Sequence, residues 1–261
     1  MNCFNRQALA GVPGEMEGFK KRCKLGIFAL AASVVLAVLL ELGSLAFMQL
    51  IYNTIVHDAS FWSGLGRTVT GFFSIILNAA PMIAVVVGLW IKKKPVALIG
   101  AAAGILFAVV NFFSTTINIF VNLFEHKLSF VSQLATILVD YPIILLTAIG
   151  YAALAFTILT AYNKLRLFPL VTVGVHAFLA FFQFVQTVVG LVQNAPMDIR
   201  QGVIGFFAVG TDVVHGLGMC ISTLCVAFFG YFAMLAINKA AAEDNATVEA
   251  TFEEVPAQDA E

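Results

Sequence analysis

The sequence predicts an all-α membrane protein, a six-transmembrane-helix bundle with the N and C termini cytoplasmic. Three observations support this fold class: the composition, six long apolar segments, and an uneven distribution of lysine and arginine. Of the 261 residues, 61% are hydrophobic and only 11% are charged. Soluble domains carry about 25% charged residues, so the composition argues against a soluble core.

Each of the six apolar segments is longer than the roughly 20 residues that a helix needs to cross a bilayer. The first begins at Leu25 and is too long for the apolar region of a cleaved signal peptide, so we interpret it as a membrane helix. The chain then divides into a basic segment 1–24, a membrane domain 25–239 and a tail 240–261. The segments are residues 25–52, 68–91, 95–121, 133–162, 167–193 and 203–237.

Lysine and arginine are concentrated in alternate connections between the segments. One side of the membrane receives only Arg67, Lys127 and Arg200. The positive-inside rule places the richer side, and with it both termini, in the cytoplasm. The basic residues lie at the membrane edge, so we expect them to contact anionic lipid and not nucleic acid. The richer side receives eleven cations: Arg6, Lys20, Lys21, Arg22, Lys24, Lys92, Lys93, Lys94, Lys164, Arg166 and Lys239.

The C-terminal tail is acidic. Seven of the 15 acidic residues fall within positions 243–261. Such a segment is expected to be disordered and solvated. It would suit the docking of a protein partner. The compact size and short loops favour a bacterial inner membrane.

The spacing of the odd-numbered segments suggests an internal repeat. They run Lys24–Asn53, Lys94–Asn122 and Arg166–Asn194, and their starts are about 70 residues apart. Three tandem helical hairpins would give this pattern. Any six-span protein with basic inner loops and polar outer loops would also give it.

Ionisable side chains inside the segments are the strongest indication of a site. Asp212 and His215 are three residues apart and share one helical face. An ionisable group inside a membrane is costly unless it is paired or hydrated. Glu41, Asp140 and Asp212 have no lysine or arginine within any span to pair with. They are therefore candidates to bind a cation or carry a proton.

Residue counting places one polar side chain from every helix in a common layer. At about 1.5 Å per residue, five of them lie roughly 16–18 Å below the outer ends of their helices. Asp140 is expected somewhat nearer the surface. His176 and His215 are expected about 27 Å and 21 Å deep, close enough to meet. The five are Glu41, Asn78, Asn111, Gln183 and Asp212.

Polar and small residues also repeat at helical spacing on the last four segments. Such stripes are expected to face one another or a hydrated cavity. The alternative is that they serve helix packing, as small and hydroxyl residues often do in membranes. Pro81 and Pro142, each close to a polar candidate, favour irregular backbone there.

These features favour a small transporter or channel-like permease with an intramembrane site for a cation, proton or small polar solute. The sequence contains no Walker A, Gly-x-Ser-x-Gly or His-Glu-x-x-His motif and predicts no cofactor. The two histidines near an aspartate would suit a proton relay, a transition metal or plain hydrogen bonding. The alternative function is a non-catalytic membrane scaffold or accessory subunit. The four cysteines are expected to be free thiols.

Overall fold

The computed structural model describes residues 23–58, 60–124, 134, 136–160 and 167–253, and every regular element in these ranges is helical. Six of the described helices are long and apolar enough to cross a membrane. The all-α class is therefore confirmed, and so is the number of helices that are long and apolar enough to span a membrane. The elements are α3 (Lys24–Ala46), η1 (Phe47–Tyr52), α4 (Asn53–Val56), α5 (Phe61–Trp90), α6 (Lys94–Phe124), η2 (Thr136–Asp140), α8 (Tyr141–Thr160), α9 (Leu167–Asp198), η3 (Ile199–Gln201) and α10 (Val203–Glu253).

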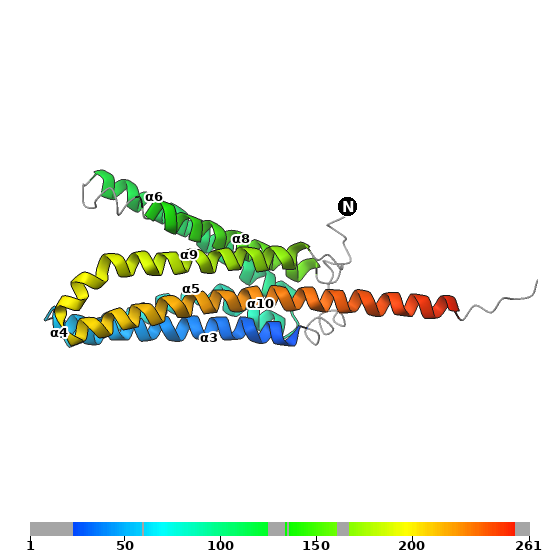
Figure 1. The fold of residues 1–261 in the computed structure, drawn as a ribbon, viewed down its shortest axis with the longest axis horizontal. Helices are drawn as coiled ribbons and strands as arrows, with labels where there is room; N and C mark the ends of the chain where they lie inside the picture. Colours follow the sequence, from blue (N-terminus) through cyan, green and yellow to red (C-terminus); the bar gives the residue numbers. More distant parts are fainter. Residues whose placement is uncertain (1–22, 59, 125–133, 135, 161–166, 254–261) are drawn as a thin grey trace, which may run out of the picture.

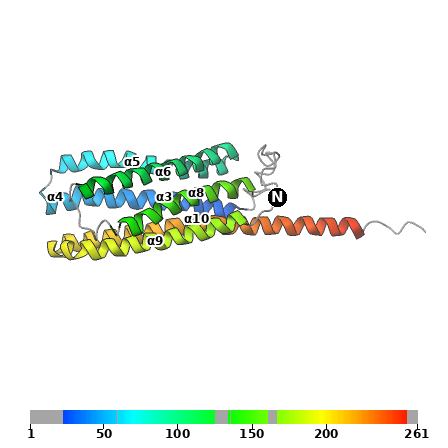
Figure 2. The same cartoon turned by 90° about the horizontal axis from the view of Figure 1, so that it is seen from above.

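The six long helices form a closed ring in chain order. Each packs against the next, and α10 returns to pack against α3 (Figures 1 and 2). A buried hydrogen bond crosses the closing contact, from Ser222 Oγ to the backbone oxygen of Ser33 at 2.8 Å. Such a ring accommodates three successive hairpins, α3–α5, α6–α8 and α9–α10. The repeat itself stays a prediction.

The N-terminal end of α3 and the C-terminal part of the sixth span lie at the same end of the ring, which we call the basic end. The Cys23 thiol lies 3.6 Å from the backbone oxygen of Phe232. The rings of Phe28 and Trp90 are 5.8 Å apart, so the lysines at 92–94 lie at this end with Lys24.

A tight turn joins α5 to α6 at the basic end. The backbone N–H of Lys93 donates to the oxygen of Gly88 at 2.8 Å, and Lys92 between them has a φ of 62°. This is the Schellman arrangement, in which a residue in the left-handed region ends a helix. It allows α6 to begin at Lys94, only four residues after the end of α5.

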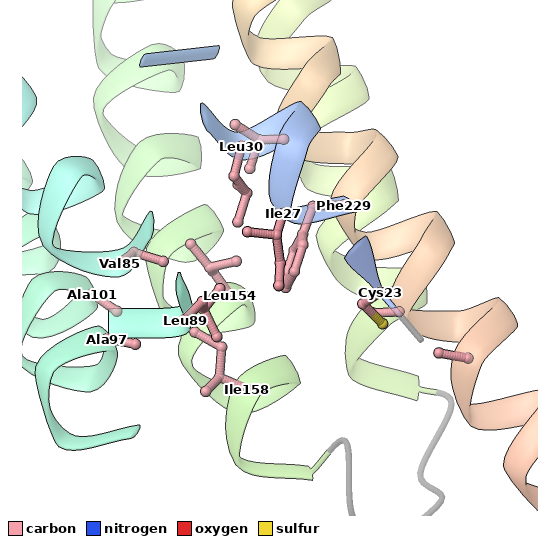
Figure 3. Packing of buried hydrophobic residues seen from close by; sticks show 13 residues of the cluster. Cys23, Ile27, Leu30, Val85, Leu89, Ala97, Ala101, Leu154, Ile158 and Phe229 are labelled. Atoms are coloured by element: carbon pink, nitrogen blue, oxygen red, sulfur yellow. The ribbon is translucent and has the colours of Figure 1, made fainter. Parts of the chain in front are cut away.

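A cluster of buried apolar side chains, the inner cluster, fills the ring towards the basic end (Figure 3). It combines residues of five helices, and Phe229 of α10 is its largest fully buried side chain. At the opposite end the α6–α8 pair diverges from α9 (Figure 1). The ring is therefore packed at its basic end and more open at the other. The members of the cluster are Cys23, Ile27, Leu30, Val85, Leu89, Ala97, Ala101, Leu154, Ile158, Val226, Phe229, Ala233 and Ala236.

The outer surface of the ring is apolar. Phe73, Ile99, Phe178 and Phe206 are each more than 60% exposed. Large apolar side chains exposed on all helices would aggregate in water, whereas lipid tails accept them without cost. The abundance of phenylalanine in the spans follows from this.

Two element boundaries differ from the sequence predictions. α5 begins at Phe61 and not near 68, because Ser60 has an extended backbone and starts the helix. Arg67 therefore lies on a helix and not in a loop. α10 continues to Glu253, where the sequence predicts a disordered tail from 240, and projects beyond the ring (Figure 1). Alanine and glutamate are abundant in 240–253, and both are good helix formers.

Irregular backbone occurs beside Asp140, in agreement with the position of Pro142. The π-helix η2 ends at Asp140, and Pro142 falls in the first turn of α8. Proline has no N–H to donate, so it leaves a carbonyl oxygen free one turn earlier. The second π-helix, η1, was not expected, because its sequence carries no proline or glycine.

Candidate functional site

A cavity of about 210 Å³, the central cavity, lies inside the ring between the inner cluster and the open end. α3, α5, α8, α9 and α10 all contribute to its wall. Four of the eight candidates from the sequence line it: Glu41, Asn78, His176 and Gln183. Val34, Ala37, Met82 and Val226 are among its apolar lining residues.

Two further cavities adjoin the central one. The outer cavity, about 540 Å³, lies between α8, α9 and α10, and shares Gln183 and Met219 with the central cavity. Asp212 and His215 line it. The side cavity, about 190 Å³, lies between α5, α6 and α8, and contains Asn111. It shares Asn78, Thr147 and Tyr151 with the central cavity.

His215 is near enough to two carboxylates to interact with both electrostatically. It interacts electrostatically with Asp212, one turn earlier on α10, and with Glu41 across the contact with α3. Its Nδ1 is buried and has no hydrogen-bond partner among the described residues. Within the described ranges Glu41 and Asp212 also form no hydrogen bond. Asp212 and His215, which the sequence places on one face of a helix, are therefore accompanied by a third ionisable group, Glu41 of α3.

The third predicted acid lies elsewhere. Asp140 accepts a hydrogen bond from Gln186 Nε2 at 2.9 Å, which links α8 to α9. It lines neither the central nor the outer cavity. A single site made of three carboxylates is therefore not formed, because the side chain of Asp140 is directed to a helix contact.

His176 lies deep in the central cavity and is only 5% exposed. Its Nδ1 is 2.8 Å from the backbone oxygen of Thr172, an acceptor, so Nδ1 carries the proton. Its ring packs against Gly150, where an added Cβ would lie 3.0 Å from Nε2. A side chain at residue 150 would therefore crowd the imidazole of His176.

The two histidines do not meet. His176 lies beside Gly150, whereas His215 lies nearer the open end and lines the outer cavity. In the part of the chain that the structure describes, no three His, Cys, Asp or Glu side chains gather closely enough to hold a metal ion. Cys23, Cys220 and Cys225 form no disulfide among the described residues; Cys3 lies outside them.

Several polar and small residues serve helix packing. Outside the polar stripes, Thr157 and Thr172 form a buried hydrogen bond of 2.9 Å between α8 and α9. Thr223 donates to Gln183 Oε1 at 2.6 Å between α10 and α9. Gly104 packs against the ring of Tyr151, where an added Cβ would lie 2.5 Å from Cδ1. The packing interpretation is thus correct for these residues, and it leaves Glu41, Asn78 and Asp212 unexplained.

One polar contact near the open end was missed in the sequence. The hydroxyl of Tyr52 donates to Asp198 Oδ1 at 2.7 Å, and Tyr52 is buried. The two residues are 146 positions apart and lie at helix ends, so no periodicity connects them. This contact joins the end of η1 to the end of α9.

The fold and its interior define a class: a multispan α-helical membrane protein with a mostly apolar cavity, lined by one carboxylate, inside a ring of helices. Comparisons with protein-family models, curated proteins and solved structures give no significant match. The function must therefore be inferred from the interior of the ring.

Proposed function

We propose that this protein is a small permease that moves a polar solute through the centre of the six-helix ring. One observation carries the proposal: Glu41 lines the central cavity and has no hydrogen-bond partner among the described residues. A carboxylate that only served packing would be expected to hold a partner, as Asp140 does with Gln186. The carboxylate of Glu41 is therefore available to bind a solute that enters the central cavity.

The route of the solute follows from the arrangement of the cavities. The outer cavity adjoins the central cavity at Gln183 and Met219. Asp212 and His215 line this approach, and Glu41 lies beyond them. The inner cluster closes the other end. The described state therefore suits entry from the open end, and release requires the inner cluster to separate.

We further propose that the basic end faces the cytoplasm of a bacterial inner membrane and contacts anionic lipid there. Lys24 and the lysines at 92–94 lie at that end, which supports this orientation through the positive-inside rule.

The orientation can be checked with reporter fusions in a bacterial host. A green fluorescent protein fused after Glu261 is expected to fluoresce, and alkaline phosphatase fused there to be inactive. The same reporters fused after Arg200, in a chain truncated at that point, are expected to behave in the opposite way. An active phosphatase after Glu261 together with a dark fluorescent fusion would reverse the orientation.

The permease function predicts that the central cavity is reached by water from both membrane faces in turn. Ala79 lines this cavity, so we would introduce Ala79→Cys into a chain whose four native cysteines are replaced by serine. A membrane-impermeant thiol reagent is expected to label it both in sealed right-side-out vesicles and in sealed inside-out vesicles. The measurement is the labelled fraction by mass spectrometry.

Val35→Cys is the matched control, because Val35 is 57% exposed on the outer surface of the ring. It should resist the charged reagent from either side. If Ala79→Cys is labelled from one face only, or from neither, the permease proposal is wrong. The scaffold interpretation would then be favoured, and deletion of residues 243–261 should abolish the capture of its partner.

A further inference from the structure

We infer that the solute is a small organic ammonium compound with a linear apolar body, its charged head held by Glu41. The inference rests on the proposed permease function and adds the chemical class of the substrate. It is carried by the composition and the axial length of the central cavity.

The charge of the lining selects a cation. Glu41 is the one acidic residue among the described residues that line the central cavity, and no lysine or arginine lines it. His176 donates its proton to Thr172 and therefore presents Nε2 as an acceptor. An anion would meet a carboxylate with no lysine or arginine among the described lining residues to compensate it, in an interior where charge repulsion is weakly screened.

The lining is a poor match for an inorganic cation. Calcium and similar ions take six to eight oxygen ligands, and magnesium takes six. Here Glu41 is the one carboxylate in the described lining, and the other oxygens belong to amides and hydroxyls, several of them held in hydrogen bonds between helices. One carboxylate would leave a divalent ion with an uncompensated positive charge in the interior.

An ammonium head needs fewer acceptors. A primary ammonium has three N–H donors, and its charge lets it pair with a single carboxylate. Glu41 supplies the charge. The side-chain oxygen of Asn78, one helix away on α5, also lines the central cavity and forms no hydrogen bond within the described ranges. Together they satisfy the head group.

The rest of the wall suits a hydrocarbon chain. On α3 the lining runs from Glu41 through Val38, Ala37 and Val34 to Ser33. Eight residues of helix separate Glu41 from Ser33, which is about 12 Å along the axis. Met82, Leu179, Met219 and Val226 line the same stretch from the other helices. An apolar body extending from the ammonium towards His176 would contact these side chains.

The test uses n-butylammonium as the probe, with n-butanol and butyrate as its neutral and anionic counterparts. Each is added to the Ala79→Cys protein in nanodiscs of zwitterionic lipid, and the rate of thiol labelling is measured. Butylammonium is expected to slow labelling in a saturable way. Butanol and butyrate at the same concentration should have less than one tenth of its effect. Equal protection by butanol, or stronger protection by butyrate, would overturn the inference.

Glu41→Gln in the same background is expected to weaken protection by butylammonium by at least 30-fold. Asp198→Asn makes the same change of charge outside the central cavity and should leave protection unchanged. Equal weakening by both variants would contradict a specific role for Glu41. If the Glu41→Gln protein does not fold, the comparison of the three probes on the Ala79→Cys protein that retains Glu41 is sufficient to test the inference. Labelling from both faces without any protection by butylammonium would reject the ammonium substrate and leave the permease function standing.

Discussion

Replacement of Glu41 by glutamine is expected to reduce the uptake of radiolabelled n-butylammonium into proteoliposomes by about 30- to 3,000-fold at low substrate concentration. Removal of one member of a buried charged pair costs about 2–5 kcal/mol, and each 1.4 kcal/mol corresponds to a factor of ten. Glutamine keeps the size and hydrogen-bonding capacity of the side chain and removes only its charge. The loss should appear mainly as a higher KM, because the carboxylate binds the ammonium before it moves.

Glu41→Asp separates charge from geometry. It keeps the charge and withdraws it by one methylene group, so it should retain more uptake than the glutamine variant. Asp198→Asn is the control for a general effect of removing an acid near the open end, since Asp198 is bonded to Tyr52 and lines none of the three cavities. Wild-type uptake by folded Glu41→Gln protein would remove Glu41 from the proposed mechanism.

The six spans were predictable because length and apolarity alone decide whether a helix crosses a membrane. The positions of the helix ends were harder to predict, because a polar turn of helix and a polar loop have the same composition. The start of α5 at Phe61 and the continuation of α10 to Glu253 both fall in such stretches. There the choice depends on helix capping and intrinsic propensity, which are weak signals.

The candidate site was predictable along each helix and less so between helices. On α9 and α10 the polar residues that repeat at helical spacing line the central and outer cavities, because both helices keep a regular period there. Examples are Gln183 and Thr187 on α9 and Asp212 and His215 on α10. Glu41, Asn78 and Gln183, which the residue count places at one depth, all line the central cavity. It could not show that Asp140 turns to Gln186, because rotation about the helix axis is set by neighbours far away in the sequence.

The π-helices are a second reason why contacts between helices could not be predicted from the sequence. A π-helical turn holds an extra residue, so it rotates the side chains on either side of it relative to a regular α-helix. η1 precedes Asn53, and η2 ends at Asp140. The helix face on which a residue lies, when it is counted through these turns at the regular α-helical period, is therefore displaced.

Replacement of Gly100 by alanine is expected to destabilise the ring strongly, because α5 and α6 touch there through their backbones. A Cβ at residue 100 would lie 2.6 Å from the backbone oxygen of Pro81 and 2.8 Å from the backbone nitrogen of Val85. Backbone atoms of a packed helix cannot rotate away as a side chain can, so the two helices must separate. Overpacking of this kind costs about 1–3 kcal/mol.

The Tm of the purified protein in detergent should fall by about 2–12 °C, since 1 kcal/mol corresponds to about 2–4 °C for a chain of this size. Valine at the same position adds two more methyl groups against α5 and should reduce the yield of monodisperse protein further. The effect is expected to reach the central cavity, because Pro81 lies one residue from Met82 in its wall.

Gly174→Ala on α9 is the matched control for a glycine-to-alanine change within a span. An added Cβ at residue 174 meets nothing within 4 Å, so alanine there loses no packing and has the better helix propensity. Its Tm should equal or exceed that of the wild type. If Gly100→Ala is as stable as Gly174→Ala, α5 and α6 do not pack through Gly100. The wall of the central cavity that α5 supplies, with Asn78 and Met82, would then need to be placed differently.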